Sequence, residues 1–194
     1  NRIVVVPGAN AAWTADDLPD GPIESARLLV VQREVPEGVV DGAIARAHAA
    51  NVPVLVNAAP ADGFDPSSLG PRDRLIVNGP EAAWLLGVEA RPEQAAASLA
   101  ARGPGDVVVT LGADGALADG RSGRAHVPGF AVEAVDTTGA GDAFVGAFAA
   151  AWTEGRGLED ALRFACAAGA EAVRTRGAQP SLPHRAAILA RLGT

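Results

Sequence analysis

The chain has 194 residues, a length that fits one domain with a sizeable hydrophobic core, and 48% of them are apolar. Its net charge of −7 argues against a nucleic-acid-binding surface, and no apolar run is long enough to span a bilayer. The lone Cys166 excludes an intrachain disulfide and, with no signal peptide in the sequence, predicts a protein of the reducing cytoplasm.

Short runs of Val, Ile and Leu alternate with alanine-rich stretches along the chain. In chain order, the runs that predict strands are Arg2–Val6, Arg27–Val31, Val52–Val56, Arg74–Val77 and Asp106–Leu111. The stretches that predict helices are Thr14–Glu24, Gly38–Ala50, Pro80–Leu86, Pro92–Ala101, Ala140–Glu154, Leu158–Arg174 and Pro183–Leu192. Two further short strands, Ala116–Asp119 and Ala125–Val127, are expected to form a hairpin.

This alternation predicts an α/β fold with a mainly parallel sheet in a single domain, residues 1–194. Nearly continuous hydrophobicity is typical of strands buried on both faces of a parallel sheet. Ligands bind outside the carboxyl ends of such strands, so polar residues that follow the strands should gather at one edge. These residues are Asn10, Glu34, Asn57, Asn78 and those of the segment Gly112–Gly115.

The segment Asp136-Thr-Thr-Gly-Ala-Gly-Asp142 is the most informative part of the chain, because an apolar helical run follows it directly. Backbone N–H groups at a helix N-terminus attract anions, so Gly139, Ala140 and Gly141 are candidate donors to a phosphoryl group. Asp142 is the candidate base that takes a proton from an attacking hydroxyl. The alternatives are a plain tight turn and a helix-capping aspartate. A P-loop is excluded, because the chain has no lysine.

The same segment resembles the C-terminal signature of the ribokinase-like (PfkB) carbohydrate kinases. Five more segments resemble parts of these kinases, in the same order: Val6–Ala11, Val56–Ala61, Asn78–Glu81, Thr110–Gly115 and Gly177–Ser181. The resemblance implies a three-layer α/β/α fold and, since the first and last segments look most like those of ribokinases, ATP-dependent phosphorylation of D-ribose. The alternatives are another sugar or nucleoside kinase of this family and a non-catalytic nucleotide-binding fragment. A Rossmann dehydrogenase is disfavoured, because no Gly-x-Gly-x-x-Gly follows the first predicted strand.

The resemblance also implies which residues meet the nucleotide and the sugar. Glu34 corresponds to a glutamate that contacts the sugar, although a solvated surface glutamate is the alternative. Cys166 lies where ribokinases often have an asparagine near the adenine. The full set of implied nucleotide-binding residues is Asn78, Thr110, Leu111, Gly112, Ala113, Asp114, Gly115, Gly141, Asp142 and Cys166.

Two cations are implied by the resemblance. A monovalent cation, K⁺, would be bound by Asp136 and the carbonyl of Thr138, and the remaining ligands map onto Ala172, Thr175, Gly177 and Ser181. Mg²⁺ would be held through water by Glu81, which follows Asn78 in an Asn-x-x-Glu pair. The alternatives are an acid that caps a loop and a capping box at the start of a helix.

The chain contains no Met and begins at Asn1, within a predicted strand. We therefore expect it to be incomplete at its N-terminus. The resemblance implies roughly a hundred further residues before Asn1, still within the size of one domain. They would contain the first strands, the lid and much of the sugar site. A homodimer formed through that lid is expected for the full-length protein.

Overall fold

The computed structural model describes residues 6–193 and contains one six-stranded sheet with the strands in sequence order. The strands are β1 Leu29–Val31, β2 Val54–Asn57, β3 Arg74–Asn78, β4 Asp106–Thr110, β5 Ala116–Gly120 and β6 Gly123–Val127. Neighbours from β1 to β4 are parallel, and β5 and β6 form an antiparallel hairpin against β4. The mainly parallel sheet is therefore confirmed. The predicted strand Arg2–Val6 lies outside the described residues, except for Val6, which belongs to no strand.

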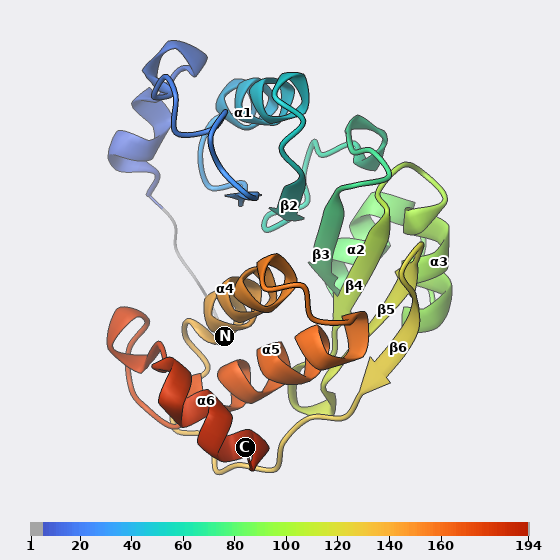
Figure 1. Ribbon diagram of the computed structural model, residues 1–194, viewed down its shortest axis with the longest axis vertical. Coiled ribbons are helices and arrows are strands. Elements are labelled where there is room, and N and C mark those ends of the chain that lie inside the picture. The colour runs from blue at the N-terminus through green and yellow to red at the C-terminus, as the bar shows by residue number, and fades with distance from the viewer. Residues whose placement is uncertain (1–5, 194) are drawn as a thin grey trace.

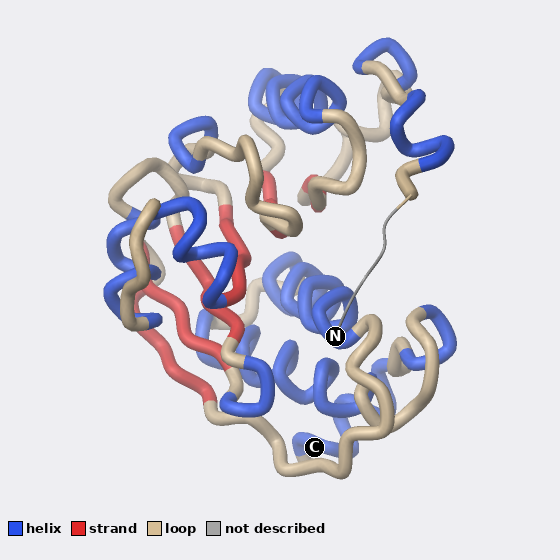
Figure 2. Tube along the Cα trace, turned by 180° about the vertical axis from the view of Figure 1, so that it is seen from behind, coloured by secondary structure: helices blue, strands red, loops and turns tan. Residues whose placement is uncertain are grey.

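Helices cover both faces of the sheet, so the predicted three-layer α/β/α architecture is confirmed. They are α1 Glu37–Ala49, α2 Gly79–Leu86, α3 Pro92–Ala100, α4 Ala140–Thr153, α5 Leu158–Ala172 and α6 Arg185–Leu192. Figure 1 shows α4, α5 and α6 together on one side of the sheet, and Figure 2 shows the same layers from behind. Among residues 6–193, no helix has both the length and the apolar character needed to cross a bilayer.

The predicted helix Thr14–Glu24 is wrong. Only Ala15–Asp17 forms a single 3₁₀ turn, and the chain continues through turns to Ser25. The Asp17 carboxylate accepts hydrogen bonds from the N–H and the hydroxyl of Thr14, both at 2.8 Å, which fixes the start of this turn. Pro19 and Pro22 lack the N–H groups that a continuing helix needs, and Gly21 has a φ of 89°, so the helix cannot extend.

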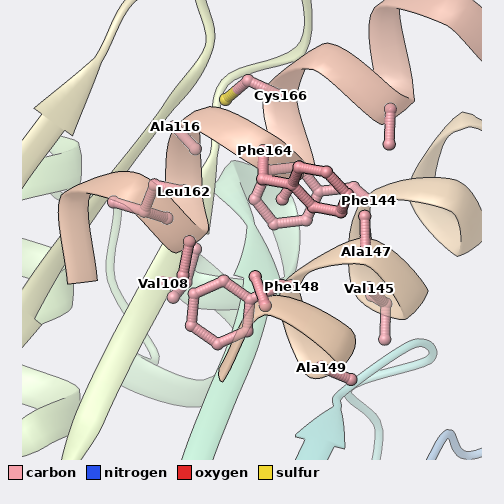
Figure 3. Packing of buried hydrophobic residues seen from close by; sticks show 14 of the residues in the cluster. Val108, Ala116, Phe144, Val145, Ala147, Phe148, Ala149, Leu162, Phe164 and Cys166 are labelled. Atoms are coloured by element: carbon pink, nitrogen blue, oxygen red, sulfur yellow. The ribbon is translucent and has the colours of Figure 1, made fainter. Parts of the chain in front are cut away.

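Successive residues of the buried strands pack into different layers, as the two-residue period of a strand requires. On β4, Val108 packs against α4 and α5, whereas Val107 and Val109 pack in the layer of α1, α2 and α3. Figure 3 shows Phe144, Phe148 and Phe164 lying between α4, α5 and the strands. The rings of Phe144, Phe148 and Trp152 stack along α4 with centroids 6.5 and 6.1 Å apart. This packing fixes α4 against the sheet and thereby positions its N-terminus.

Glu154 joins the C-terminal end of α4 to α6. Its carboxylate lies 2.5 Å from Nη1 of Arg185 and 3.2 Å from Nε of Arg156. The hydrogen bond from Arg185, the largest cause, lowers the pKa of Glu154 from 4.5 to about 2. Because the pKa is lowered on folding, this contact contributes stability above pH 4.5 that is lost as the pH falls towards 2.

We expect the carboxyl carbon signal of Glu154, followed by NMR, to titrate near pH 2 in the wild type. In Arg185→Ala the midpoint should move up towards 4.5, because the main hydrogen-bond donor is gone. An unchanged Glu154 midpoint in Arg185→Ala would show that the hydrogen bond from Arg185 is not the main cause of the low pKa of Glu154.

Candidate active site

Polar residues from several strands meet at the carboxyl edge of the sheet, as the sequence predicts. Asn78 at the end of β3 is in register with Thr110 at the end of β4, and Asn57 ends β2 beside them. Glu34 follows the end of β1, and its carbonyl oxygen accepts a hydrogen bond from the Asn10 side chain at 3.3 Å. The structure therefore brings the Asn10 segment to Glu34 at this edge.

The N-terminus of α4 presents unpaired donors to solvent at the Gly-Ala-Gly segment. Gly139 is the N-cap residue, with φ 80° and ψ −3°, and no side chain caps the helix. Within residues 6–193, the N–H groups of Gly139, Gly141 and Asp142 have no acceptor, whereas the N–H of Ala140 reaches the carbonyl oxygen of Thr137 at 3.3 Å. Free N–H groups at the positive end of a helix dipole form a binding site for an anion.

The Asp142 side chain is exposed in the first turn of α4, next to these donors. It does not occupy the N-cap position, so the alternative of a capping aspartate is not what the structure shows. Within the described residues, its carboxylate has no hydrogen-bond or ion-pair partner of its own. It is therefore free to accept a proton from a ligand.

Asp136 fixes the loop that leads into α4. One carboxylate oxygen accepts the N–H of Gly177 at 2.9 Å, and the other accepts the N–H of Thr138 at 3.0 Å. These hydrogen bonds, with that from Gly177 the largest cause, lower the pKa of Asp136 to about 2. The carboxylate is therefore ionised at neutral pH and ties the 136–138 segment to the chain after α5.

The predicted K⁺ ligands lie in two segments that the structure joins, residues 135–138 and 172–181. The carbonyl oxygen of Val173 accepts the N–H groups of Val135 and Asp136 at 2.8 and 3.1 Å. The Ser181 hydroxyl donates to the carbonyl oxygen of Ala178 at 2.7 Å and lies 3.4 Å from that of Thr138. Ala172 and Thr175 are linked by a 3.2 Å backbone hydrogen bond in the same segment.

This oxygen-rich loop pair fits a hard monovalent cation. Among residues 6–193, no three His, Cys, Asp or Glu side chains gather into a group that could hold a metal, so carbonyl and hydroxyl oxygens would supply most ligands. The bonds around Asp136 also match the alternative of a loop-capping acid.

Asn78 and Glu81 form a capping box at the start of α2. The Asn78 side chain accepts the Glu81 N–H at 2.8 Å, and the Glu81 carboxylate accepts the backbone and side-chain N–H groups of Asn78 at 2.8 and 2.9 Å. Burial raises the pKa of Glu81. Each carboxylate oxygen keeps a second lone pair, so the capping box does not prevent Glu81 from accepting a hydrogen bond from a metal-bound water.

A cavity of about 370 Å³ opens between the N-terminus of α4, the loop after β4 and α5. Six of the predicted nucleotide-binding residues line it: Thr110, Gly112, Ala113, Gly115, Gly141 and Cys166. The other four do not line it: Asn78, Leu111, Asp114 and Asp142. Ala140, predicted as a phosphoryl donor, also lines it. Sequence reasoning missed the rest of the lining, namely Gly129, Phe130, Ala131, Val132, Ala134, Thr137, Phe144, Gly169, Ala170 and Val173.

Close backbone contact builds one wall of this cavity. A Cβ at Gly115 would lie 2.1 Å from the Val127 carbonyl oxygen, and a Cβ at Gly129 would lie 2.0 Å from that of Ala113. Only glycine permits these approaches. The opposite wall is formed by residues at helical spacing along α5 and its C-cap: Cys166, Gly169, Ala170 and Val173. That spacing was the signal that could have revealed this wall.

Replacing Gly139 by alanine tests the loop before α4. The positive φ disfavours a side chain by about 1–2 kcal/mol, and the new Cβ would lie 3.1 Å from the Ala178 carbonyl oxygen. We expect Gly139→Ala to lower stability by about that amount and to weaken nucleotide binding, measured by denaturant unfolding and calorimetry. Gly146→Ala on the same helix is the control: it meets no atom within 4 Å and should stabilise by about 0.5–1 kcal/mol. Equal effects of the two substitutions would contradict this account of Gly139.

Comparison with known proteins gives consistent results. Residues 1–185 match the pfkB family carbohydrate kinase model. Ribokinase from Bacillus subtilis is 36% identical over 189 residues, which cover 95% of this chain and 62% of that protein. Ribokinase from Thermotoga maritima superposes with a TM-score of 0.90 at 34% identity, over 100% of this chain and 65% of that one.

The structure of Arabidopsis thaliana ribokinase complexed with ribose and ATP matches with a TM-score of 0.86 at 32% identity, again over 100% of this chain and 65% of that one. The chain thus spans less than two thirds of the length of these relatives. The family match covers nearly all of the chain, and the relatives agree with it in sequence and in fold. This chain belongs to the pfkB family of carbohydrate kinases.

Proposed function

We propose that the protein transfers the γ-phosphate of ATP to the 5-hydroxyl of D-ribose. The observation that carries the proposal is the combination at the N-terminus of α4: unpaired N–H groups of Gly139 and Gly141 beside the free carboxylate of Asp142. Phosphoryl transfer needs little from a protein beyond positioning and charge stabilisation, and this arrangement supplies both.

In this proposal the N–H groups of Gly139, Gly141 and Asp142 hold the transferring phosphoryl group. The Asp142 carboxylate accepts the proton of the attacking hydroxyl, a role worth about 10²–10⁴-fold in rate. Donors aimed in advance at the developing charge stabilise the transition state without reorganising. Asp136 acts indirectly, because its two hydrogen bonds keep the donor loop in place.

Cations would complete the charge balance, since none of the residues that line the cavity is cationic. Mg²⁺, held through water at Glu81, would supply neutralising charge at the phosphates, and K⁺ at the Asp136 loop would stiffen the donor segment. Asp136 and the carbonyl oxygens of Thr138 and Gly177 are the groups in this chain best suited to K⁺.

D-ribose is the acceptor that the comparisons favour, because ribokinases are among the relatives most similar to this chain. Glu34 would hold the sugar from the carboxyl edge of the sheet, where Asn10 also lies. The segment Gly177–Ser181 packs against the Asp136 loop through Gly177 and Ser181. Other sugars, nucleosides and nucleotide binding without catalysis remain the competing possibilities.

A substrate panel tests the proposal directly. ADP release by the full-length protein is measured with Mg·ATP and each of D-ribose, 2-deoxyribose, fructose and a nucleoside, with and without K⁺. We expect release that depends on D-ribose and increases with K⁺. Equal release with every acceptor would contradict the ribose assignment, and nucleotide binding without release would favour a binding module.

A further inference from the structure

The end of the 370 Å³ cavity that lies away from the α4 N-terminus contains almost no polar side chains. Only three lining residues carry a polar side-chain atom: Thr110, Thr137 and Cys166. Thr137 belongs to the phosphate end, because its carbonyl oxygen accepts the N–H of Ala140. The Thr110 hydroxyl is directed to the Val77 carbonyl oxygen, at 3.4 Å. The thiol of Cys166 is therefore the one polar side-chain group left to face a nucleobase.

The Cys166 thiol is poorly suited to recognising a base by hydrogen bonding. It is 7% exposed, and burial raises its pKa to about 11, so it stays protonated. A protonated thiol is only a weak hydrogen-bond donor and a weak acceptor. Cys166 lies one helical turn from Gly169, whose backbone packs near the carbonyl oxygen of Ala140 in the first turn of α4. The surface around Cys166 on α5 is therefore apolar and close to the phosphate site.

The facing wall, Gly129–Ala134, offers backbone groups instead of side chains. The side chains that line the cavity from this segment are Phe130, Val132 and two alanines, whereas the exposed Glu133 does not line it. Within residues 6–193 no intramolecular hydrogen bond holds the backbone of this segment. Each peptide group carries both an N–H donor and a carbonyl acceptor. A segment whose backbone has no internal hydrogen bonds can therefore pair with either a donor or an acceptor on the edge of a base. The wall therefore presents packing surface without a fixed pattern of donors and acceptors.

We infer that this cavity selects the purine ring by shape and packing and does not distinguish the hydrogen-bonding edges of different purines. The inference rests on the proposed nucleotide site and names its donor class: purine nucleoside triphosphates rather than ATP alone. An apolar pocket discriminates between ligands of equal shape only weakly, whereas a pocket built to hydrogen-bond one edge rejects the other by about 10⁴–10⁵.

Adenine and hypoxanthine make the sharpest comparison. They have nearly the same shape, but the donor and acceptor on the six-membered ring edge are exchanged. Calorimetry measures Kd for Mg·ADP and Mg·IDP with this chain, and Mg·CDP serves as a base with less apolar surface. We expect the two purine Kd values to agree within about tenfold and Mg·CDP to bind more weakly than both. A purine ratio above about tenfold, or CDP binding as tight as the purines, overturns the inference.

The variant Cys166→Ala tests whether the base is recognised by packing or by a hydrogen bond to the thiol. It removes the one polar side-chain atom facing the base, so the ratio of the two purine Kd values should stay within about twofold of the wild-type ratio. A larger change in that ratio would show that the thiol recognises the base by hydrogen bonding, contrary to the inference. Failure of every nucleotide to bind would overturn the proposed ATP site itself, and unequal purine binding would overturn only the inference about selectivity.

Discussion

Substitution of Asp142 by asparagine should reduce kcat for phosphoryl transfer by about 10²–10⁴-fold. Asparagine keeps the size of the side chain but cannot accept the proton of the attacking hydroxyl. The backbone donors at Gly139 and Gly141 remain, so nucleotide binding should be at least as tight as in the wild type. The substitution removes the negative charge of Asp142 beside bound phosphates, so no attraction to the nucleotide is lost. The measurements are ADP release and calorimetric titration of Mg·ADP.

Asp160→Asn is the matched control for this substitution. Asp160 is likewise an exposed acid in the first turn of a helix, α5, on the same side of the sheet. It should leave both turnover and nucleotide affinity close to wild type, because it lies in the first turn of α5 and not beside the unpaired N–H groups at the N-terminus of α4. If Asp142→Asn retained the turnover of the control, the assignment of Asp142 as the base would be wrong.

Substitution of Asp106 by alanine should lower the free energy of unfolding by about 3–5 kcal/mol. Asp106 is 0% exposed at the start of β4. Its carboxylate accepts the N–H and the hydroxyl of Ser122 at 2.7 and 2.8 Å and lies 2.9 Å from Nε of Arg74. Loss of this partner would leave the buried guanidinium of Arg74 without its ion-pair partner at 2.9 Å and the hairpin between β5 and β6 without its anchor.

Asp119→Ala is the control for Asp106→Ala in denaturant unfolding. Asp119 also pairs with an arginine on this sheet, but the side chain of its partner Arg124 is 68% exposed. Solvent-exposed pairs contribute about 0–1 kcal/mol, so Asp119→Ala should change stability by no more than that. Equal destabilisation by both substitutions would mean that burial of the Asp106 carboxylate does not decide its contribution.

Much of the fold could be predicted because the strands are strongly patterned. β3 and β4 are buried on both faces, so their sequences read as continuous apolar runs, and the predicted ends at Val77 and Leu111 each lie one residue from the observed ends. The predicted helix Thr14–Glu24 failed because Pro19 and Gly21 favour turns, and the helical structure ends after the single turn Ala15–Asp17.

The site could be predicted only in part. Gly139–Asp142 combines the candidate donors and the candidate base in consecutive residues, so a phosphoryl-binding site could be proposed there from the sequence alone. The cavity wall at Gly129–Val132 could not be predicted from the sequence. It depends on close contact between the backbone of the segment after β4 and that of the segment after β6. The same holds for the bond from Gly177 to Asp136, which joins residues 41 positions apart. Contacts of this kind leave no local pattern.

The most direct test of this account is an experimental structure of the chain with Mg²⁺ and a non-hydrolysable ATP analogue. We expect the terminal phosphate within hydrogen-bond distance of the N–H groups of Gly139 and Gly141, and the base between Cys166 and Phe130. A nucleotide bound anywhere else, with the α4 N-terminus unoccupied, would contradict the account.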